Sequence, residues 1–109
     1  MRKSWFPAFV LALVLSVLSQ AYAEDYVLTL KDHQFSPREL TVPANQKVKI
    51  IVKNLDDSAA EFESSDLNRE KVVAANGEIT VFIGPVDAGS YGYFDDFHRT
   101  TTTGTIIAK

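Results

Sequence analysis

Sulfur is almost absent from this sequence. The chain has no cysteine, and its single methionine is the first residue, Met1. Disulfide bonds, thiolate ligands and thioether ligands are therefore excluded for every residue after Met1. Stability has to come from core packing or from a bound ligand, and a metal would have to be held by oxygen and nitrogen atoms.

The chain also lacks an apolar run long enough to cross a membrane. The run over residues 5–18 is shorter than the ~20 residues that a spanning helix needs. Two basic residues precede this run, and a small-x-small pattern ending at Ala23 follows it, as is typical of a cleavable secretory signal. We predict a signal peptide over residues 1–23, a mature domain over residues 24–109 and a location outside the cytoplasm. An uncleaved N-terminal anchor is the alternative.

Basic side chains are in deficit. The chain has 11 lysine and arginine residues against 14 aspartate and glutamate residues, a net charge of −3. The predicted signal peptide carries two of the basic residues, so the mature domain has nine against fourteen and a net charge near −5. This balance argues against nucleic-acid binding, which needs a basic face, and is compatible with attraction of cations.

The sequence does contain a series of short alternating segments. Apolar and polar residues alternate over 26–31, 39–43, 47–53, 79–83, 91–95 and 105–108, with turn-forming residues between them. This pattern predicts an all-β sandwich or small barrel. One short helical turn is expected over residues 65–70, where an N-cap candidate precedes helix-forming residues. The phenylalanines expected in the core are Phe35, Phe62, Phe82, Phe94 and Phe97.

Several segments resemble cupredoxins in their order along the chain. They are Phe35-Ser-Pro37, Glu39-Leu-Thr-Val42, the strand and turn from Val48 to Asp56, Gly89-Ser-Tyr91-Gly-Tyr93, His98, and Gly104-Thr-Ile-Ile107. The segments DHQFSPREL, EFESSDLNREKVV and YFDDFH are more closely similar to the cysteine-free, EfeO-type cupredoxin-like periplasmic proteins of bacterial iron-uptake systems. The resemblance implies an all-β, cupredoxin-like Greek-key sandwich over residues 24–109 and a periplasmic location.

The sequence departs from the blue-copper pattern at three of the four ligand positions. The resemblance places the ligand cysteine at Asp95, the axial methionine near Thr102 and the first histidine at Ala60-Glu61, and it retains the second histidine as His98. A type 1 copper centre needs a thiolate and two imidazoles. Such a centre is therefore excluded.

Residues of metal-ligand types nevertheless gather around these positions. Glu61 and Glu63 share one face of a strand, and the resemblance places this segment at the same end of the sandwich as the retained histidine. A second histidine and either Asp95 or Asp96 complete the set, with Asp96 favoured because the narrower family is acidic there. The predicted metal ligands are His98, Glu63, Glu61, Asp96 and His33. Such ligands suit Fe(II), Fe(III), Mn(II), Zn(II) and Cu(II), and the resemblance favours iron, copper or both.

Each of these residues also has an ordinary interpretation. Glu61 and Glu63 would equally form a solvated strand face, and His33 would equally be a surface residue of a polar turn. Clustered carboxylates raise one another's pKa, and a metal would offset that cost. The basic side chains that would offset it without a metal are Arg38, Arg69, Lys71 and Arg99.

The resemblance implies a function in iron uptake. The protein would bind iron, copper or both and pass iron to an inner-membrane iron permease. A second periplasmic iron- and copper-binding protein and an electron-transfer membrane protein are the other implied partners. One alternative is a small copper-assisted ferroxidase, and another is a metal-free interaction module. The sequence leaves open whether the protein is an enzyme, and we expect an accessory metal-binding protein.

Overall fold

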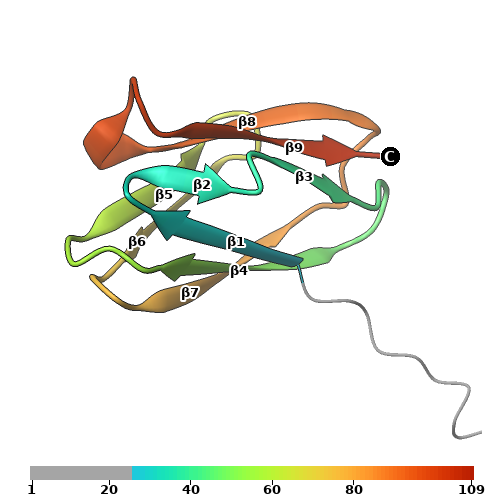
Figure 1. Cartoon of the computed structure of the whole chain (residues 1–109). Coiled ribbons are helices and arrows are strands. Elements are labelled where there is room, and N and C mark those ends of the chain that lie inside the picture. Colours follow the sequence, from blue (N-terminus) through green and yellow to red (C-terminus); the bar gives the residue numbers. More distant parts are fainter. Residues whose placement is uncertain (1–25) are drawn as a thin grey trace, which may run out of the picture.

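The computed structural model describes residues 26–109 and places them in two β-sheets that face each other (Figure 1). The predicted signal peptide lies outside the described residues. The elements are β1 Tyr26–Lys31, β2 Gln34–Ser36, β3 Glu39–Val42, β4 Val48–Asn54, β5 Ala60–Ser64, β6 Arg69–Val73, β7 Glu78–Ile83, β8 Gly89–Asp95, the 3₁₀ helix η1 Asp96–His98 and β9 Thr103–Ala108. The predicted all-β sandwich is confirmed.

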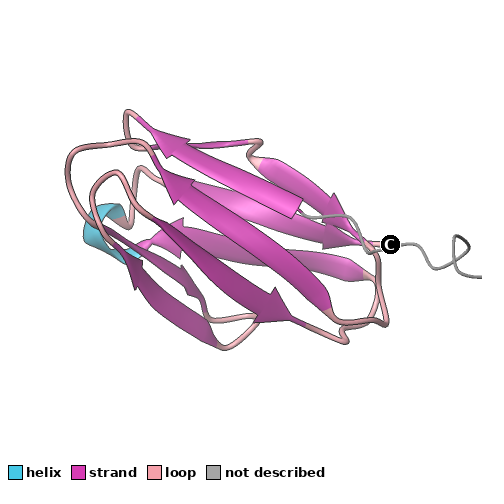
Figure 2. Cartoon of the chain, turned by 90° about the horizontal axis from the view of Figure 1, so that it is seen from below, coloured by secondary structure: helices cyan, strands magenta, loops and turns pink. Residues whose placement is uncertain are grey.

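One sheet has the strand order β2-β1-β4-β7 and the other has the order β3-β9-β8-β5-β6 (Figure 2). The pairs β1 with β4 and β3 with β9 are parallel, and the remaining pairs are antiparallel. Some strands that follow each other in sequence, such as β4 and β5, lie in opposite sheets. These crossings are typical of Greek-key sandwiches.

Period-two alternation explains the core. On β4, Val48, Ile50 and Val52 are buried, whereas Lys49 and Lys53 are exposed. Neighbouring side chains of a strand point to opposite faces of its sheet, so one face of β4 is apolar and the other is charged. The apolar inner faces of the two sheets then pack on each other.

An aromatic group fills the space between the sheets. Tyr93 on β8 is buried, and its ring lies edge-on to Phe35 of the opposite sheet at 4.9 Å between centroids. The same ring stacks on Phe62 of β5 at 5.3 Å. Tyr93 thus joins β2 of one sheet to β5 of the other.

The helical turn predicted over residues 65–70 is wrong in its position. Residues 65–68 form the turn of the β5–β6 hairpin, and η1 is the one helical segment within residues 26–109. The Ser64 hydroxyl accepts a hydrogen bond from the Leu67 N–H at 3.1 Å, and Asn68 has a φ of +55°. A residue in the left-handed region cannot continue a right-handed helix, so the chain reverses into β6.

Two of the phenylalanines expected in the core lie at the surface. Phe82 is 46% exposed and Phe97 is 51% exposed, whereas Phe35 and Phe62 are buried as expected. The Phe82 ring lies under the ammonium group of Lys47, which is 4.9 Å from the ring centroid. A cation above the ring face is a favourable contact for an exposed aromatic side chain.

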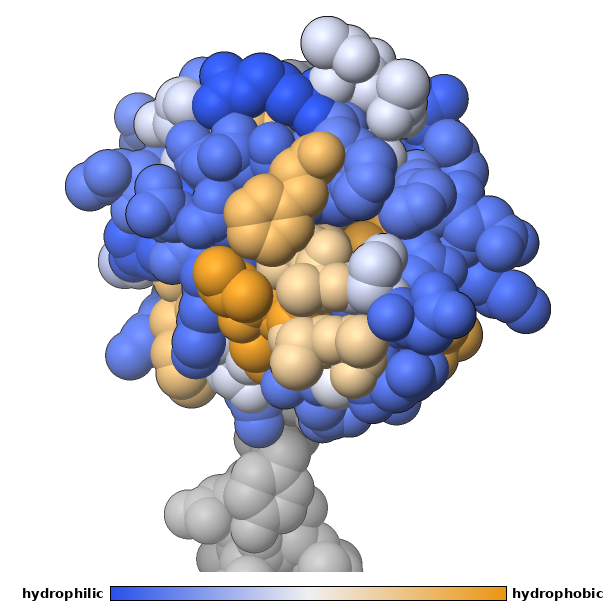
Figure 3. Space-filling model, turned by 90° about the vertical axis from the view of Figure 1, so that its left-hand side faces the viewer, coloured by the Kyte–Doolittle hydropathy of each residue, from blue (hydrophilic) through white to orange (hydrophobic). Residues whose placement is uncertain are grey.

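Several connections meet at one end of the sandwich, opposite the C-terminus (Figure 1). They are the β1–β2 turn at 32–33, the β4–β5 loop at 55–59, the β6–β7 loop at 74–77 and the segment 96–102. We call this side the loop end. Figure 3 looks onto it and shows an apolar area among polar residues. Leu55 and Phe97, which lie in these connections, are large exposed apolar residues. Among the described residues, no helix has the length and apolarity needed to span a membrane.

Candidate functional site

Three carboxylates converge on the outer face of the β5–β6 hairpin. Phe62 points into the core, so Glu61 and Glu63 on either side of it point outward. Glu70 on β6 lies directly opposite Glu63 in the antiparallel register. One oxygen of each of these glutamates lies within 4.8 Å of the other two. We call Glu61, Glu63 and Glu70 the glutamate cluster.

Sequence reasoning did not include Glu70. It belongs to a segment rich in helix-forming residues, which concealed strand β6. Once residues 65–68 form a hairpin turn, the pairing of Ser64 with Arg69 places Glu70 opposite Glu63. The left-handed Asn68 is the signal that was available, because asparagine is common at such turn positions.

The carboxylates of the glutamate cluster repel one another. Partial burial is the largest cause that raises the pKa of Glu61, and a hydrogen bond with Asp96 raises it further. The charges of Glu70, Asp96 and Glu63 add to the same shift of the Glu61 pKa. Like charges directly across a sheet are unfavourable, so this cluster is electrostatically destabilising in the absence of a cation.

The nearby cations are largely engaged with other groups. Arg99 forms an ion pair with Asp96, whose Oδ1 lies 3.0 Å from Nε and 2.5 Å from Nη2 of the guanidinium. The pKa of Arg99 is raised mainly by this hydrogen bond and to a smaller extent by the charge of Glu63. Arg69 donates to the carbonyl groups of Phe82, Leu67 and Asn68. Lys71 donates to the Thr80 carbonyl. Within residues 26–109, no lysine or arginine forms an ion pair with the glutamate cluster.

The two histidines lie together at the loop end. The rings of His33 and His98 have centroids 4.1 Å apart and planes tilted by 38°. The Thr102 hydroxyl donates to the His33 carbonyl at 2.8 Å, so the segment after η1 is tied to the β1–β2 turn. The structure thereby brings together His33 and His98, which are 65 positions apart in sequence.

The ring of His98 is held by a buried carboxylate. Its Nδ1 atom is 2.9 Å from Oδ2 of Asp95, whose side chain is inaccessible to solvent. The other oxygen of Asp95 accepts from the backbone N–H groups of Glu61 at 2.9 Å and Phe97 at 3.0 Å. Because these two backbone hydrogen bonds hold the Asp95 carboxylate in place, Asp95 fixes the ring of His98 relative to β5.

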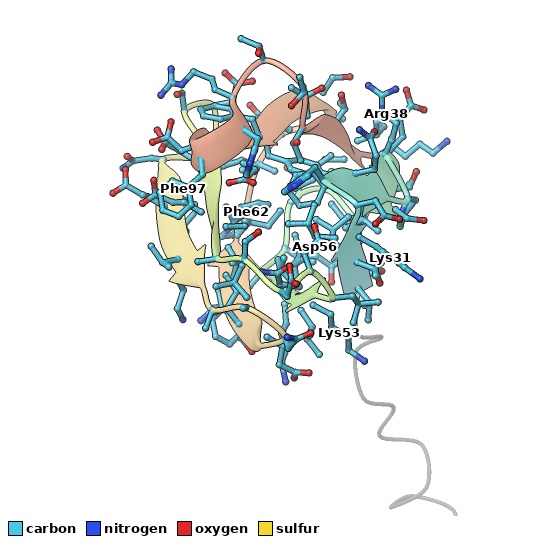
Figure 4. The ribbon with its side chains drawn as sticks, turned by 60° about the vertical axis from the view of Figure 1, so that its left-hand side comes forward. Lys31, Arg38, Lys53, Asp56, Phe62 and Phe97 are labelled. Atoms are coloured by element: carbon cyan, nitrogen blue, oxygen red, sulfur yellow. The ribbon has the colours of Figure 1, made fainter. Side chains whose placement is uncertain are left out.

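The β1–β2 turn is held in a similar way by Asp56. Its carboxylate accepts from the backbone N–H groups of Asp32 at 2.6 Å and His33 at 3.0 Å, and Oδ2 lies 3.8 Å from Nδ1 of His33. Burial raises the pKa of Asp56, but these backbone hydrogen bonds and the charges of His33 and His98 outweigh it and lower the pKa overall. Figure 4 shows Asp56 between the two sheets at this end, with Phe62 deeper in the core and Phe97 at the rim.

The predicted ligands therefore fall into two groups. Glu61, Glu63 and Asp96 lie on the outer face with Glu70, whereas His33 and His98 lie together above Asp56 and Asp95. No group of three potential ligands within the described residues combines a histidine with the glutamate cluster. Of the two aspartates left open, Asp95 points inward to His98 and Asp96 points outward to Arg99. The role of all these residues as metal ligands stays a prediction.

The fold agrees with the comparison to known families. A family model described as the cupredoxin-like domain matches residues 5–108. The chain belongs to this cupredoxin-like family. An uncharacterized protein of Rickettsia prowazekii (strain Madrid E) is 44% identical to it over 82 residues, which are 75% of this chain and 66% of that relative. This cupredoxin-like chain thus spans slightly less than two thirds of the length of that protein.

Solved structures show the same fold. Auracyanin A, a "blue" copper protein from the bacterium Chloroflexus aurantiacus, superposes with a TM-score of 0.69 at 17% identity, covering 79% of this chain and 98% of that one. Amicyanin from Paracoccus versutus superposes with a TM-score of 0.64 at 16% identity, covering 84% of this chain and 87% of that one. At these identities the likeness is one of fold.

The residues of this cupredoxin-like protein do not fit a type 1 copper centre. The position assigned to the cysteine holds Asp95, that of the methionine holds Thr102, and that of the first histidine holds Ala60-Glu61. Of these residues, Asp95, Thr102 and Ala60 are buried and Glu61 is partly exposed. None of these side chains is a thiolate, a thioether or an imidazole, which are the ligands that such a centre uses. Blue-copper chemistry is therefore not transferred to this chain.

Proposed function

We propose that this cupredoxin-like protein is a periplasmic metal-binding component of a bacterial iron-uptake system and holds iron at the glutamate cluster. The observation that carries the proposal is the convergence of Glu61, Glu63 and Glu70 within 4.8 Å. Within residues 26–109 none of them has an ion-pair partner. A site of this composition supplies three anionic oxygens and no sulfur.

A cation would turn the repulsion in this cluster into attraction. Glu63 and Glu70 face each other directly across the hairpin, and their neighbours raise the pKa of Glu61. Opposite charge close by favours the ionised form of a carboxyl group, so a bound cation is expected to lower the pKa of Glu61. Asp96, which already contacts Glu61, is a further oxygen donor once Arg99 releases it.

The choice of iron rests on ligand chemistry and on the sequence resemblance together. Carboxylate oxygens favour hard cations over Cu(I), and the segments EFESSDLNREKVV and YFDDFH resemble iron-uptake proteins. In this proposal the protein delivers iron to an inner-membrane permease and works with a second periplasmic iron- and copper-binding protein. The fold supports metal handling in general, since auracyanin A is itself a copper protein.

Iron titration of the mature protein, residues 24–109, tests the proposal. With Fe(II) added under nitrogen and followed by calorimetry, we expect one ion per chain. The melting temperature should rise, because a ligand that binds only the folded state stabilises it. Glu63→Gln keeps the size of the side chain but removes its charge, and it should weaken binding by about tenfold or more.

Glu78→Gln is the matched control. Glu78 is an exposed glutamate at the start of β7, in the sheet that does not carry the cluster. Its substitution should leave iron binding unchanged. If iron binding were weakened equally in both variants, the effect would come from general surface charge and not from the glutamate cluster. If the melting temperature of the wild type did not change on addition of Fe(II), the metal-free interaction module would be favoured instead.

A further inference from the structure

We infer that the outer face of the sheet β2-β1-β4-β7 docks on the surface of a lipid bilayer that carries anionic headgroups. The residues that would contact the headgroups are Lys31, Lys47, Lys49 and Lys53, and we call them the lysine face. The inference does not depend on the proposed iron function, since the glutamate cluster lies on the other sheet. It rests on how the fold distributes charge, on the lysines themselves and on the apolar residues among them.

The two outer faces of the sandwich carry opposite charges. Leu30 on β1 and Ile50 on β4 are buried, so their neighbours in sequence point outward from the sheet. The outward residues of β1, β4 and β7 include three lysines and one glutamate, which are Lys31, Lys49, Lys53 and Glu78. By the same alternation the other sheet presents four glutamates outward, Glu39, Glu61, Glu63 and Glu70. A chain with a net charge of −3 thus gathers cations on one face.

The ammonium groups of the lysine face are not neutralised by the rest of the sandwich. None of the four lysines forms an ion pair within residues 26–109, although Glu78 lies directly opposite Lys53 in the strand register. The contact of Lys47 with the Phe82 ring leaves its ammonium group charged. In Figure 4 the side chains of Lys31 and Lys53 point away from the core. The four positive charges are therefore free to meet an anionic surface.

Apolar residues lie between the lysines. The register places Val27 beside Ile51 in the middle of the face, and Lys49 and Lys53 flank Ile51 along β4. The exposed Phe82 lies opposite Lys49. Lysine stems cover apolar surface while their charged ends reach outward. A sheet face with an apolar middle and positive charges around it matches the boundary of a bilayer, where acyl chains lie beneath anionic headgroups.

The type of cation favours a lipid surface over an acidic protein. Interfaces between proteins are enriched in arginine and depleted in lysine, because the rigid fork of arginine matches carboxylates that are held in fixed positions. All four cations of the lysine face are lysines. Lysine carries a compact charge on a flexible stem, which suits headgroups that move and offer no fixed geometry. We therefore assign this face to a bilayer.

Binding of this kind is weak, reversible and dependent on salt. Each lysine near an anionic membrane surface increases the affinity by about fivefold. Salt screens these charges over a Debye length of about 10 Å at 0.1 M ionic strength. Because the two sheets have their outer faces on opposite sides of the sandwich, docking through the lysines turns the glutamate cluster away from the bilayer. The cluster is then open to solvent on the docked protein.

Co-sedimentation of residues 24–109 with lipid vesicles tests the inference. This chain omits the apolar run over residues 5–18, which would bind a bilayer by itself. We expect binding to vesicles of equimolar phosphatidylglycerol and phosphatidylcholine, no binding to phosphatidylcholine alone, and release at about 1 M salt, where the Debye length is about 3 Å. Lys49→Gln and Lys53→Gln should each weaken binding by about fivefold. Both positions are exposed, so the melting curves should match that of the wild type.

Lys109→Gln is the matched control, because it removes the same charge from an exposed lysine that follows β9 in the other sheet. It should retain the affinity for vesicles within about twofold. Glu63→Gln should also retain vesicle binding while it weakens iron binding, which separates this inference from the proposed function. Equal binding of the wild type to both kinds of vesicle, or equal weakening by Lys109→Gln and Lys49→Gln, would overturn the inference.

Two further outcomes would assign the lysine face to another occupant. If the protein bound poly-L-glutamate through Lys49 and Lys53 but did not bind the vesicles, the face would belong to an acidic protein. If the protein associated with itself at low salt without vesicles, and Lys49→Gln abolished that association, the glutamates of a second copy would be the occupant. Either result would overturn the inference. We expect neither, and sedimentation velocity without lipid should show one species of monomer size.

Discussion

Asp95 organises the loop end at the scale of single residues. It occupies the position that the cupredoxin resemblance assigns to a cysteine, and its carboxylate is completely buried. Burial of an ionised group is costly unless its oxygens receive hydrogen bonds. Asp95 receives them from the Glu61 and Phe97 N–H groups and from Nδ1 of His98. One carboxylate thus connects β5, η1 and a candidate ligand.

Asp95→Asn should destabilise the protein without changing its size. The amide removes the charge and places a donor opposite the Nδ1–H of His98, so that ring either loses its acceptor or has to change its tautomer. The expected loss in the free energy of unfolding is about 2–3 kcal/mol, measured by urea denaturation with an unchanged m-value. Asp57→Asn, at an exposed position of the β4–β5 loop, should change it by less than about 0.5 kcal/mol. Equal effects would show that Asp95 is not special.

The resemblance predicted that Glu61 and Glu63 converge with His98 at one end of the sandwich, and the structure does not group the histidine with these glutamates. His33 and His98 were both expected near a metal, and they do lie 4.1 Å apart. The direction of Asp95 and Asp96 depends on where β8 ends and η1 begins, which alternation alone does not fix. The tertiary structure, and not the sequence pattern, determines that His98 pairs with Asp95 and not with a glutamate.

At the scale of elements, the β5–β6 hairpin decides the composition of the glutamate cluster. Residues 69–73 contain helix-forming side chains, yet they pair with β5 over its whole length. Tertiary packing overrides weak local preferences of this kind. The period-two signal was clear for β4, which is buried on alternate positions, and weak for β6, where four of five residues are exposed. An edge strand carries little apolar pattern for sequence reasoning to detect.

Ser64 holds this hairpin in place. Its buried hydroxyl donates to the Gly92 carbonyl at 2.6 Å and accepts from the Leu67 N–H at 3.1 Å. Ser64→Ala leaves both backbone groups without that partner, and we expect a loss of about 1–3 kcal/mol in the free energy of unfolding. Chemical denaturation measures it. The same change at the exposed Ser65 should have little effect, and similar losses at both positions would contradict this account of the turn.

At the scale of the whole molecule, two sheets and a shared aromatic core were predictable, whereas the distribution of the phenylalanines was not. Alternating segments with polar turns require two apolar sheet faces to pack together. Phe97 follows β8 in the loop-end segment, and it is half exposed there. The alternation rule does not apply outside a strand, so it gives no direction for such a side chain.

Tyr93 links the two sheets and gives the molecule a specific sensitivity to alkali. Burial is the main cause that raises the pKa of its hydroxyl far above the ordinary value. The folded state keeps the proton in a range where the unfolded chain releases it. Stability from this group is therefore complete below pH ~10, the tyrosine value in an unfolded chain, and is lost as the pH rises from there towards the folded pKa.

Tyr93→Phe should remove this alkaline sensitivity. The hydroxyl makes only long contacts, 3.4 Å to the Pro37 carbonyl and 3.5 Å to the Arg38 carbonyl, so at pH 7 the variant should match the wild type within about 1 kcal/mol. Above pH ~10 the wild type should lose up to about 1.4 kcal/mol per pH unit relative to the variant. Urea denaturation from pH 7 to 11.5 measures both curves. Tyr91→Phe removes a hydroxyl that is hydrogen-bonded at the surface to the Asp87 carbonyl, and it should retain the wild-type loss of stability above pH ~10. If the stability of the wild type and of Tyr93→Phe fell in parallel with pH, Tyr93 would not be the cause of the alkaline sensitivity.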